Sequence, residues 1–327
     1  MNASGTMLTR LTRLNCATNT NGFKRPHKPV LLLTVTLLAE AGELAENKIL
    51  FNPRLLEIFR RLFLAARQPS DQFTPHYPFF HLSSEGFWIL VPNPGKDDEL
   101  KFYTASKGVG KLRELVAWAS LDPELHRMML NPQSRHEIQA ALIQHYLPHV
   151  SESMWTALKE ETLIASREKE LLTDVPSRGD QLIDRVRSAA FRRVIRDLYD
   201  VRCAACGVRF FFGDVDLIDA AHLIPFSEGG DDRPPNGMAL CKNHHWLMDH
   251  AILAPGPARG HDYTRPVWHV GQGLDERIEE HQPLLKLKGQ PVLLPRDPRH
   301  HPAREGLDWR LAQLKSGYVR TEVDYAE

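Results

Sequence analysis

The sequence predicts an α+β protein from three local patterns. Residues 30–40 form an apolar segment that directly follows a proline, which is typical of the first turn of a buried helix. Residues 54–66 carry apolar side chains at helical spacing behind the capping residue Asn52. The segments 77–82 and 86–91 are rich in aromatic and β-branched residues and predict a β-hairpin. Helices beside a small antiparallel sheet define the α+β class.

The length of 327 residues predicts two domains, since domains commonly hold about 150 residues. We expect the first domain over residues 1–150, with further helices at 111–119 and 137–146. A charged helical linker is expected over residues 151–179, and the second domain over residues 180–327. Within the second domain we expect these elements: a helix over 180–199, a strand over 215–224, a loop over 227–235, short strands at 267–269 and 291–294, and a last helix over 305–315.

Four residues of the second domain have the spacing of a structural zinc site. They form two pairs, Cys203 with Cys206 and Cys241 with His244, and each pair encloses two residues. This spacing allows a turn to bring both members onto one tetrahedral ion. Three thiolates and one imidazole complete the coordination of Zn²⁺, so this metal is expected to hold structure rather than to perform chemistry.

Three further residues lie in the same stretch: His222, Asn236 and His245. Together with the zinc pairs, over roughly residues 185–255, they resemble the HNH (ββα-metal) nucleases. The resemblance implies that His222 is the general base that activates water, and that Asn236 holds the connecting loop. It implies that His245, on the following helix, ligates a catalytic divalent cation such as Mg²⁺ or Mn²⁺. Histidine is suited to proton abstraction because its ordinary pKa is about 6.5.

Helical geometry separates His244 from His245, because adjacent helix residues point about 100° apart. Asp249 follows His245 by one helical turn, so the two side chains can hold one metal ion. Many HNH nucleases carry an aspartate directly before the first histidine, whereas Ala221 stands there in this chain. We therefore assign the ligand role to Asp249, with Asp219 as a weaker candidate.

The net charge and the cysteine content of the chain indicate how it could bind DNA and in which cell compartment it works. Lys and Arg number 41 and Asp and Glu number 41, so any DNA-binding surface must be a local patch. One such patch is the helix over 180–199, whose arginines form either a solvated face or a phosphate-contacting face: Arg185, Arg187, Arg192, Arg193 and Arg196. The zinc pairs use three of the four cysteines, which favours a reducing cytoplasm. We expect no membrane association, because no apolar run is long enough to span a bilayer and no secretory signal is evident.

The first domain resembles, over roughly residues 20–120, the sulfur-binding domains of type IV restriction endonucleases that recognise phosphorothioate-modified DNA. The resemblance rests on the sequence Arg-Pro-His-Lys-Pro at 25–29 and on Tyr-Pro-Phe-Phe-His-Leu at 77–82. It implies an apolar cup for sulfur and a cationic rim for phosphate. The cup residues are Tyr77, Pro78 and His81, and the rim residues are Lys24, Arg25, His27 and Lys28. His81 departs from the small residue expected beside the cup.

These observations predict a modification-dependent restriction endonuclease that binds phosphorothioated DNA and cuts it nearby by a one-metal HNH mechanism. One active site makes one nick, so double-strand cleavage requires a homodimer or two binding events. Two alternatives stay open. One is a nuclease that recognises a flipped, modified base in an aromatic cage, which Phe73, Tyr77, Phe79 and Trp88 could form. The other is a non-cleaving DNA-binding protein stabilised by zinc.

Overall fold

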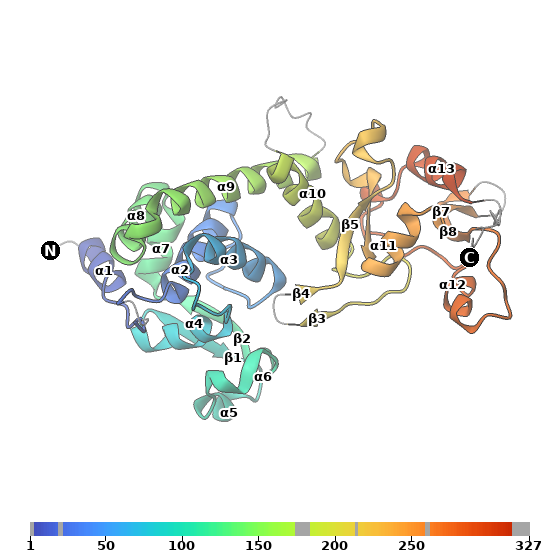
Figure 1. Cartoon of the computed structure of the whole chain (residues 1–327). Coiled ribbons are helices and arrows are strands. Elements are labelled where there is room, and N and C mark those ends of the chain that lie inside the picture. The colour runs from blue at the N-terminus through green and yellow to red at the C-terminus, as the bar shows by residue number, and fades with distance from the viewer. Residues whose placement is uncertain (1–2, 19–21, 174–183, 213–214, 259–261, 316–327) are drawn as a thin grey trace, which may run out of the picture. The chain divides into compact units, whose positions relative to one another are not determined.

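The computed structural model describes residues 3–18, 22–173, 184–212, 215–258 and 262–315 (Figure 1). The chain divides into two compact units, 1–166 and 167–327. Within the described residues, helices alternate with small antiparallel two-stranded sheets, which confirms the α+β class. No helix among them is both long and apolar enough to cross a membrane.

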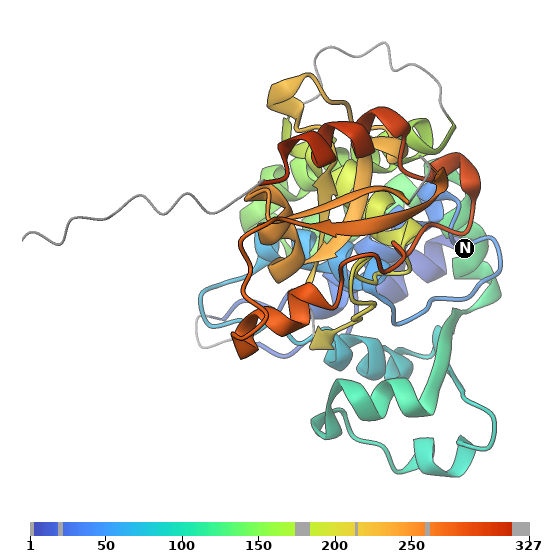
Figure 2. The same ribbon diagram turned by 90° about the vertical axis from the view of Figure 1, so that its right-hand side faces the viewer.

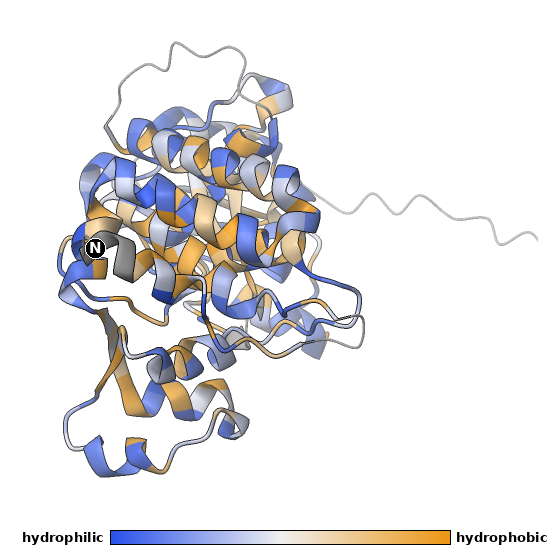
Figure 3. Ribbon diagram, turned by 90° about the vertical axis from the view of Figure 1, so that its left-hand side faces the viewer, coloured by the Kyte–Doolittle hydropathy of each residue, from blue (hydrophilic) through white to orange (hydrophobic). Residues whose placement is uncertain are grey.

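The described residues of the first unit form a group of helices around one hydrophobic core, with one two-stranded sheet. Figure 3 shows that polar and apolar residues share most of these helices, as amphipathic packing requires. Its elements are α1 (Ala3–Leu11), α2 (His27–Ala41), α3 (Pro53–Ala66), α4 (His76–His81), β1 (Trp88–Pro92), α5 (Asp97–Lys101), α6 (Gly108–Leu115), β2 (Val116–Leu121), α7 (Pro123–Leu130), α8 (Pro132–Tyr146) and the first part of α9 (Ser151–Thr173).

Helix α2 is central to this core and confirms the helix expected at residues 30–40. Its side chains are buried from Lys28 to Ala39. The buried hydroxyls of Thr34 and Thr36 donate to helix carbonyls, which satisfies them inside the core. Gly42 ends the helix in the left-handed conformation that glycine adopts at low cost.

The hairpin expected between residues 77–82 and 86–91 is wrong. Residues 76–81 form helix α4, and β1 pairs instead with β2 in the register Trp88↔Leu121. The expected helix at 111–119 is correspondingly divided, since α6 ends at Leu115 and β2 begins at Val116. Phe79 of α4 is fully buried in the core and Phe80 packs against it, so their β propensity is overridden by burial.

The second unit is built around a strand pair and two flanking helices. Figure 2 shows helix α13 beside strand β7, which agrees with the contacts between these elements. Its elements are α10 (Asp184–Leu198), β3 (Phe211–Phe212), β4 (Val215–Asp216), β5 (Ile218–His222), β6 (Gly237–Cys241), α11 (Lys242–Asp249), β7 (Leu253–Ala258), β8 (Asp262–Val270), α12 (Gln282–Leu285) and α13 (Arg304–Gln313). The helix predicted to begin at residue 180 is described only from Asp184.

Strands β5 and β6 with helix α11 form a ββα unit. The strands are antiparallel, and His222 lies opposite Gly237 in the register. Gly237 leaves room for α10 there, because a Cβ atom on it would lie 2.2 Å from Cδ1 of Ile195 and 2.9 Å from Cε2 of Phe191. Helix α10 therefore lies directly against the strand pair and brings its side chains to the end of β5.

Candidate functional site

Three thiols and one imidazole converge at one end of the ββα unit. Cys203 and Cys206 follow α10, Cys241 ends β6, and His244 lies in the first turn of α11. One ligand atom from each residue lies within 4.8 Å of all the others. Nδ1 of His244 is 3.0 Å from Sγ of Cys241 and 3.5 Å from Sγ of Cys203. These donors fit a metal ion in a closed tetrahedral site, and the assignment to zinc stays a prediction.

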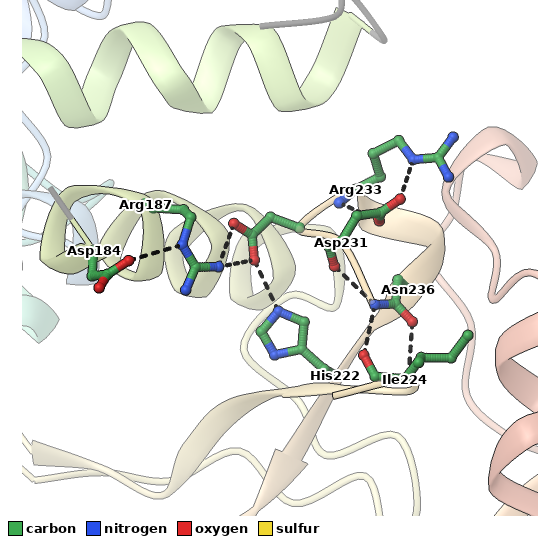
Figure 4. Close-up of polar contacts among 8 residues, drawn as sticks. Asp184, Arg187, His222, Ile224, Asp231, Arg233 and Asn236 are labelled. Carbon is green, nitrogen blue, oxygen red and sulfur yellow. Dashed lines mark hydrogen bonds and ion pairs between the residues drawn. The ribbon is translucent and has the colours of Figure 1, made fainter. Parts of the chain in front are cut away.

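His222, at the end of β5, is held by groups from two directions. Its Nε2 lies 2.9 Å from Oδ1 of Asp232 (Figure 4). Its ring stacks on the ring of Phe191, with centroids 3.9 Å apart and an angle of 8° between the planes. The side chain keeps 24% of its surface exposed, so one part of the ring remains open to a reactant.

Asp232 is buried, and a second partner holds it. Nη1 of Arg187, on α10, lies 2.8 Å from Oδ1 and 2.7 Å from Oδ2 of Asp232. Burial by itself would raise the pKa of Asp232, but the hydrogen bonds from His222 and Arg187 outweigh it and lower that pKa. Asp232 therefore remains a carboxylate next to the histidine.

Two of the other arginines of α10 are buried rather than on a polar face. Arg193 is 2% exposed and Arg196 is 5% exposed. Nη1 of Arg193 lies 3.3 Å from Oε1 of Glu168. A buried, paired guanidinium cannot contact a DNA backbone from this position. The expectation that all five arginines share one exposed face is therefore wrong, and Arg187 is an ion-pair partner of Asp232.

Asn236 closes the loop between β5 and β6. Its Oδ1 accepts from the backbone N–H of Ile224 at 2.8 Å, and its Nδ2 donates to the carbonyls of Ile224 at 3.0 Å and Asp231 at 2.8 Å (Figure 4). Gly230 is required beside it, since a Cβ atom there would lie 1.9 Å from the carbonyl oxygen of Ile224. The amide thus fixes the loop that carries Asp232.

His245 lies between two carboxylates. Its Nδ1 is 3.6 Å from Oδ2 of Asp219, and its Nε2 is 3.3 Å from Oδ2 of Asp249. Burial would raise the pKa of Asp219, yet the hydrogen bonds from His245 and Lys242 lower it to about 2. His244 and His245 therefore belong to different sites, as helix geometry predicts. Carboxylates with an imidazole suit a divalent cation such as Mg²⁺ or Mn²⁺.

Arg310, on α13, connects the two halves of this site. Its Nη2 donates to the carbonyl of His222 at 2.7 Å and lies 3.3 Å from Oδ1 of Asp249, while its Nη1 donates to the carbonyl of Met248 at 3.2 Å. The guanidinium is buried, and burial lowers its pKa against the attraction of Asp249. The predicted last helix therefore packs on the ββα unit and braces it.

A pocket of about 550 Å³ opens in the first unit. It brings together six of the seven side chains predicted for DNA recognition, and Lys24 is the one outside it. Its lining residues are Asn15, Cys16, Ala17, Arg25, His27, Lys28, Gln72, Thr74, Tyr77, Pro78, His81 and Ser84. The pocket therefore joins segments that lie some 50 residues apart in the chain.

The charged groups of this pocket are largely paired. Lys28 forms an ion pair with Glu85, and both side chains are 10% exposed. Arg25 lies 3.7 Å from Asp71 and remains 40% exposed. Lys28, which we assign to the cationic rim, is thus paired with Glu85, and the charges that line the pocket are largely compensated.

The histidines of the pocket are held or buried as well. Nε2 of His27 is 2.8 Å from the carbonyl of Gln72. Burial lowers the pKa of His27 and, with help from Lys28, that of His81.

Two known protein families match separate parts of this chain. Residues 4–158 match the family described as the ScoMcrA-like DNA sulfur-binding domain. Residues 203–254 match the family described as HNH endonuclease. The chain joins a DNA sulfur-binding domain to an HNH endonuclease domain. The pocket lies within the first match, and the residues from Cys203 to Asp249 lie within the second.

Two solved structures are similar to parts of this chain. One is a modification-dependent TagI restriction endonuclease, with 23% identity, a TM-score of 0.29, and a match that covers 39% of each chain. The other is the sulfur-binding domain of SprMcrA complexed with phosphorothioated DNA, with 22% identity and a TM-score of 0.35. That match covers 49% of this chain and 97% of the other. None of the curated proteins matches this chain.

The sequence patterns do not identify three residues of these sites. In the HNH domain these are Asp232 and Arg310, and in the sulfur-binding domain the missed residue is Glu85. Asp232 lies in a loop rich in Gly, Asp and Pro, where nothing distinguishes it from Asp231. Arg310 lies 88 residues from the histidine whose carbonyl it contacts. Only the folded chain identifies these partners.

Proposed function

We propose that this protein is a modification-dependent restriction endonuclease that binds phosphorothioated DNA and hydrolyses phosphodiester bonds nearby. The observation that carries the proposal is the presence of a sulfur-binding domain and an HNH endonuclease domain in one chain. We assign DNA recognition to residues 1–150 and cleavage to residues 180–327, joined by residues 151–179.

Recognition of sulfur is assigned to the pocket around Pro78. Replacing a phosphate oxygen with sulfur gives a larger and more weakly hydrated atom. A pocket with apolar walls and few free charges gains more from enclosing such an atom than from enclosing a well-hydrated oxygen. Tyr77 and Pro78 supply the apolar wall, with His81 beside them. Arg25 supplies the exposed cation that positions the phosphate, a contact that carries no information about sulfur.

Cleavage is assigned to the site on the ββα unit. His222 takes a proton from the attacking water, and Asn236 fixes the loop that follows it. His245 and Asp249 would hold the divalent cation, with Asp219 as the alternative carboxylate. When bound, such a cation neutralises charge that develops on the phosphate oxygens. Asp219 lies near Nδ1 of His245 and Asp249 lies near Nε2, so each carboxylate is at a different edge of the ring.

The structural metal is assigned to the quartet of Cys203, Cys206, Cys241 and His244. A closed set of four protein ligands leaves no position for a substrate, so zinc here would stabilise the fold. The quartet joins the start of the HNH domain to β6 and α11. It thereby fixes the helix that carries His245.

An aromatic cage for a flipped base is less compatible with this structure. Phe79 and Trp88 are buried in the core and contact each other edge to face, with centroids 5.3 Å apart. Phe73 packs against Phe59 and Phe63. Of the four aromatic residues considered for a cage, Tyr77 alone lines the pocket. One aromatic ring cannot sandwich a base, which favours sulfur as the recognised mark.

Competition binding with paired duplexes, identical except for one sulfur, tests the recognition step. Tyr77→Ser or Pro78→Ser should lower affinity for the sulfur duplex towards the ordinary level and leave ordinary binding little changed. The loss should be about ten- to a hundred-fold, since one sulfur buries an area worth ~1–3 kcal/mol. Arg25→Gln is the matched control and should weaken both duplexes equally. Equal binding of both duplexes by the wild-type protein would overturn the assignment.

A further inference from the structure

The imidazole of His222 has one nitrogen engaged and one available. Nε2 faces the buried carboxylate of Asp232 at 2.9 Å, and a carboxylate can only accept a hydrogen bond. The hydrogen atom must therefore reside on Nε2, and the lone pair on Nδ1. Stacking on Phe191 fixes the plane of the ring, and the bond from Arg310 fixes the backbone carbonyl of the same residue.

We propose that Asp232 is a positioning residue for catalysis, which holds His222 in the Nε2–H tautomer so that Nδ1 is the nitrogen that takes the proton from water. This inference rests on the proposed role of His222 as general base. The identity of the base does not by itself specify which nitrogen acts. The contact with Asp232 specifies Nδ1, because it places the hydrogen atom on Nε2.

Arg187 fixes both the orientation and the charge of the Asp232 carboxylate. It contacts both oxygens of Asp232, which fixes the orientation of the carboxylate against the ring. It also favours the ionised form, so the proton gained by His222 stays on the imidazole and is not passed to Asp232. Charged groups that contact His222, Asp232 or Arg187 include Asp184 from α10 and Arg310 from α13.

The proposed step transfers one proton and exchanges one bond to phosphorus. The water proton moves to Nδ1 of His222, which gives an imidazolium with hydrogen on both nitrogens. The remaining water oxygen forms a new bond to phosphorus, and the bond from phosphorus to the leaving sugar oxygen breaks. That sugar oxygen takes a proton from solvent. Asp232 changes no bond and stabilises the imidazolium by its charge.

Asp232→Asn tests this role, because an amide can present either an acceptor or a donor to Nε2. Arg187 donates to both oxygen positions of Asp232, and the single amide oxygen can occupy only one of them. With that oxygen at Oδ2, where the contact with Arg187 is 2.7 Å, the amide NH₂ takes the place of Oδ1 and faces His222. Nε2 then becomes an acceptor, and hydrogen moves to Nδ1, where it blocks the base. We expect the first-order rate of metal-dependent nicking to fall about 10²- to 10⁴-fold at neutral pH, as for a general base in the wrong tautomer.

Asp231→Asn is the matched control, since it removes the same charge at the neighbouring position. The Asp231 carboxylate contacts Arg233, away from His222 (Figure 4). This variant should nick at the wild-type rate. The full chain with its zinc should be used throughout, and binding to the duplex should be measured in parallel.

Nitrogen-15 NMR of the imidazoles reads the tautomer directly and does not depend on activity. The His222 signals are assigned by their loss in His222→Ala. We expect the neutral ring to carry hydrogen on Nε2 in the wild-type protein and on Nδ1 in Asp232→Asn. Hydrogen on Nδ1 in the wild type would overturn the inference even if the variant failed to fold, as would wild-type nicking by a folded Asp232→Asn protein. Wild-type nicking by His222→Ala would instead remove the proposed general base.

Discussion

At the scale of single residues, neighbours decide what an imidazole can do. His244 lies among thiols, His245 lies between two carboxylates, and His222 faces one buried carboxylate. The first arrangement suits a structural metal, the second a hard divalent cation, and the third a base with a fixed tautomer. The spacing of these residues predicts the first two arrangements. It contains nothing that predicts the third.

Two histidines of the pocket, His27 and His81, should make DNA binding depend on pH. Burial lowers the pKa of His27 and of His81 from the ordinary value of 6.5, so both rings are neutral at pH 7 and gain charge only in more acidic solution. A charged ring attracts phosphate whether or not sulfur is present. Affinity for both duplexes should therefore be constant from about pH 7 to 8.5 and should rise about ten-fold as pH falls below 6.5, the ~1.5 kcal/mol of one charged hydrogen bond, while the preference for sulfur stays unchanged.

Paired-duplex binding across this pH range, at constant ionic strength, measures the effect. The double variant His27→Gln with His81→Gln is the control and should lose the change in acid. An affinity that varies between pH 7 and 8.5 would contradict the assigned protonation states.

At the scale of elements, local patterns predict helices better than they predict strand partners. Asn52 caps α3 through a 2.9 Å bond to the N–H of Leu55, and Gly42 ends α2, as their sequence positions indicate. The strand that pairs with β1 cannot be predicted from a local pattern, because β2 begins 24 residues after β1 ends. Pairing over that separation depends on the core between the strands, which no local window contains.

The candidate site divides in the same way. The zinc quartet and His245 with Asp249 follow from spacing, because turns and helical periodicity are local. Asp232 and Arg310 act through contacts that the whole unit must fold to create. The ion pair between Lys28 and Glu85 is a further example, because these residues lie 57 positions apart in the sequence.

Loss of the quartet should unfold the HNH domain and leave the sulfur-binding domain intact. Cys206→Ala removes one of four metal ligands, and binding of a structural zinc contributes on the order of 10 kcal/mol to folding. We expect the variant to lose zinc and nicking activity, and to lose one thermal transition in calorimetry. Binding to phosphorothioated duplex should persist.

Cys16→Ala is the matched thiol control, because Cys16 lies in the other unit and should leave the zinc content unchanged. Atomic absorption gives the metal content of both variants. Stoichiometric zinc and full nicking activity in Cys206→Ala would show that the quartet is not a metal site.

At the scale of the whole molecule, recognition and cleavage are assigned to different units, each with its own buried residues. The formal net charge of zero gives no overall attraction to DNA. Recognition must therefore come from local contacts, and cleavage should depend on the mark that the first unit binds. We therefore expect that mutations can abolish binding or cleavage separately, and that the wild-type protein cleaves only DNA that carries the mark.

Cleavage of matched plasmids, with and without phosphorothioate links, tests this coupling most directly. The plasmids should have the same sequence and should be incubated with full-length protein and Mg²⁺ or Mn²⁺ at physiological salt. We predict nicking or cutting of the phosphorothioated plasmid, with the ordinary plasmid left intact over the same time. Equal cleavage of both plasmids, or cleavage of neither with any divalent cation, would contradict the account.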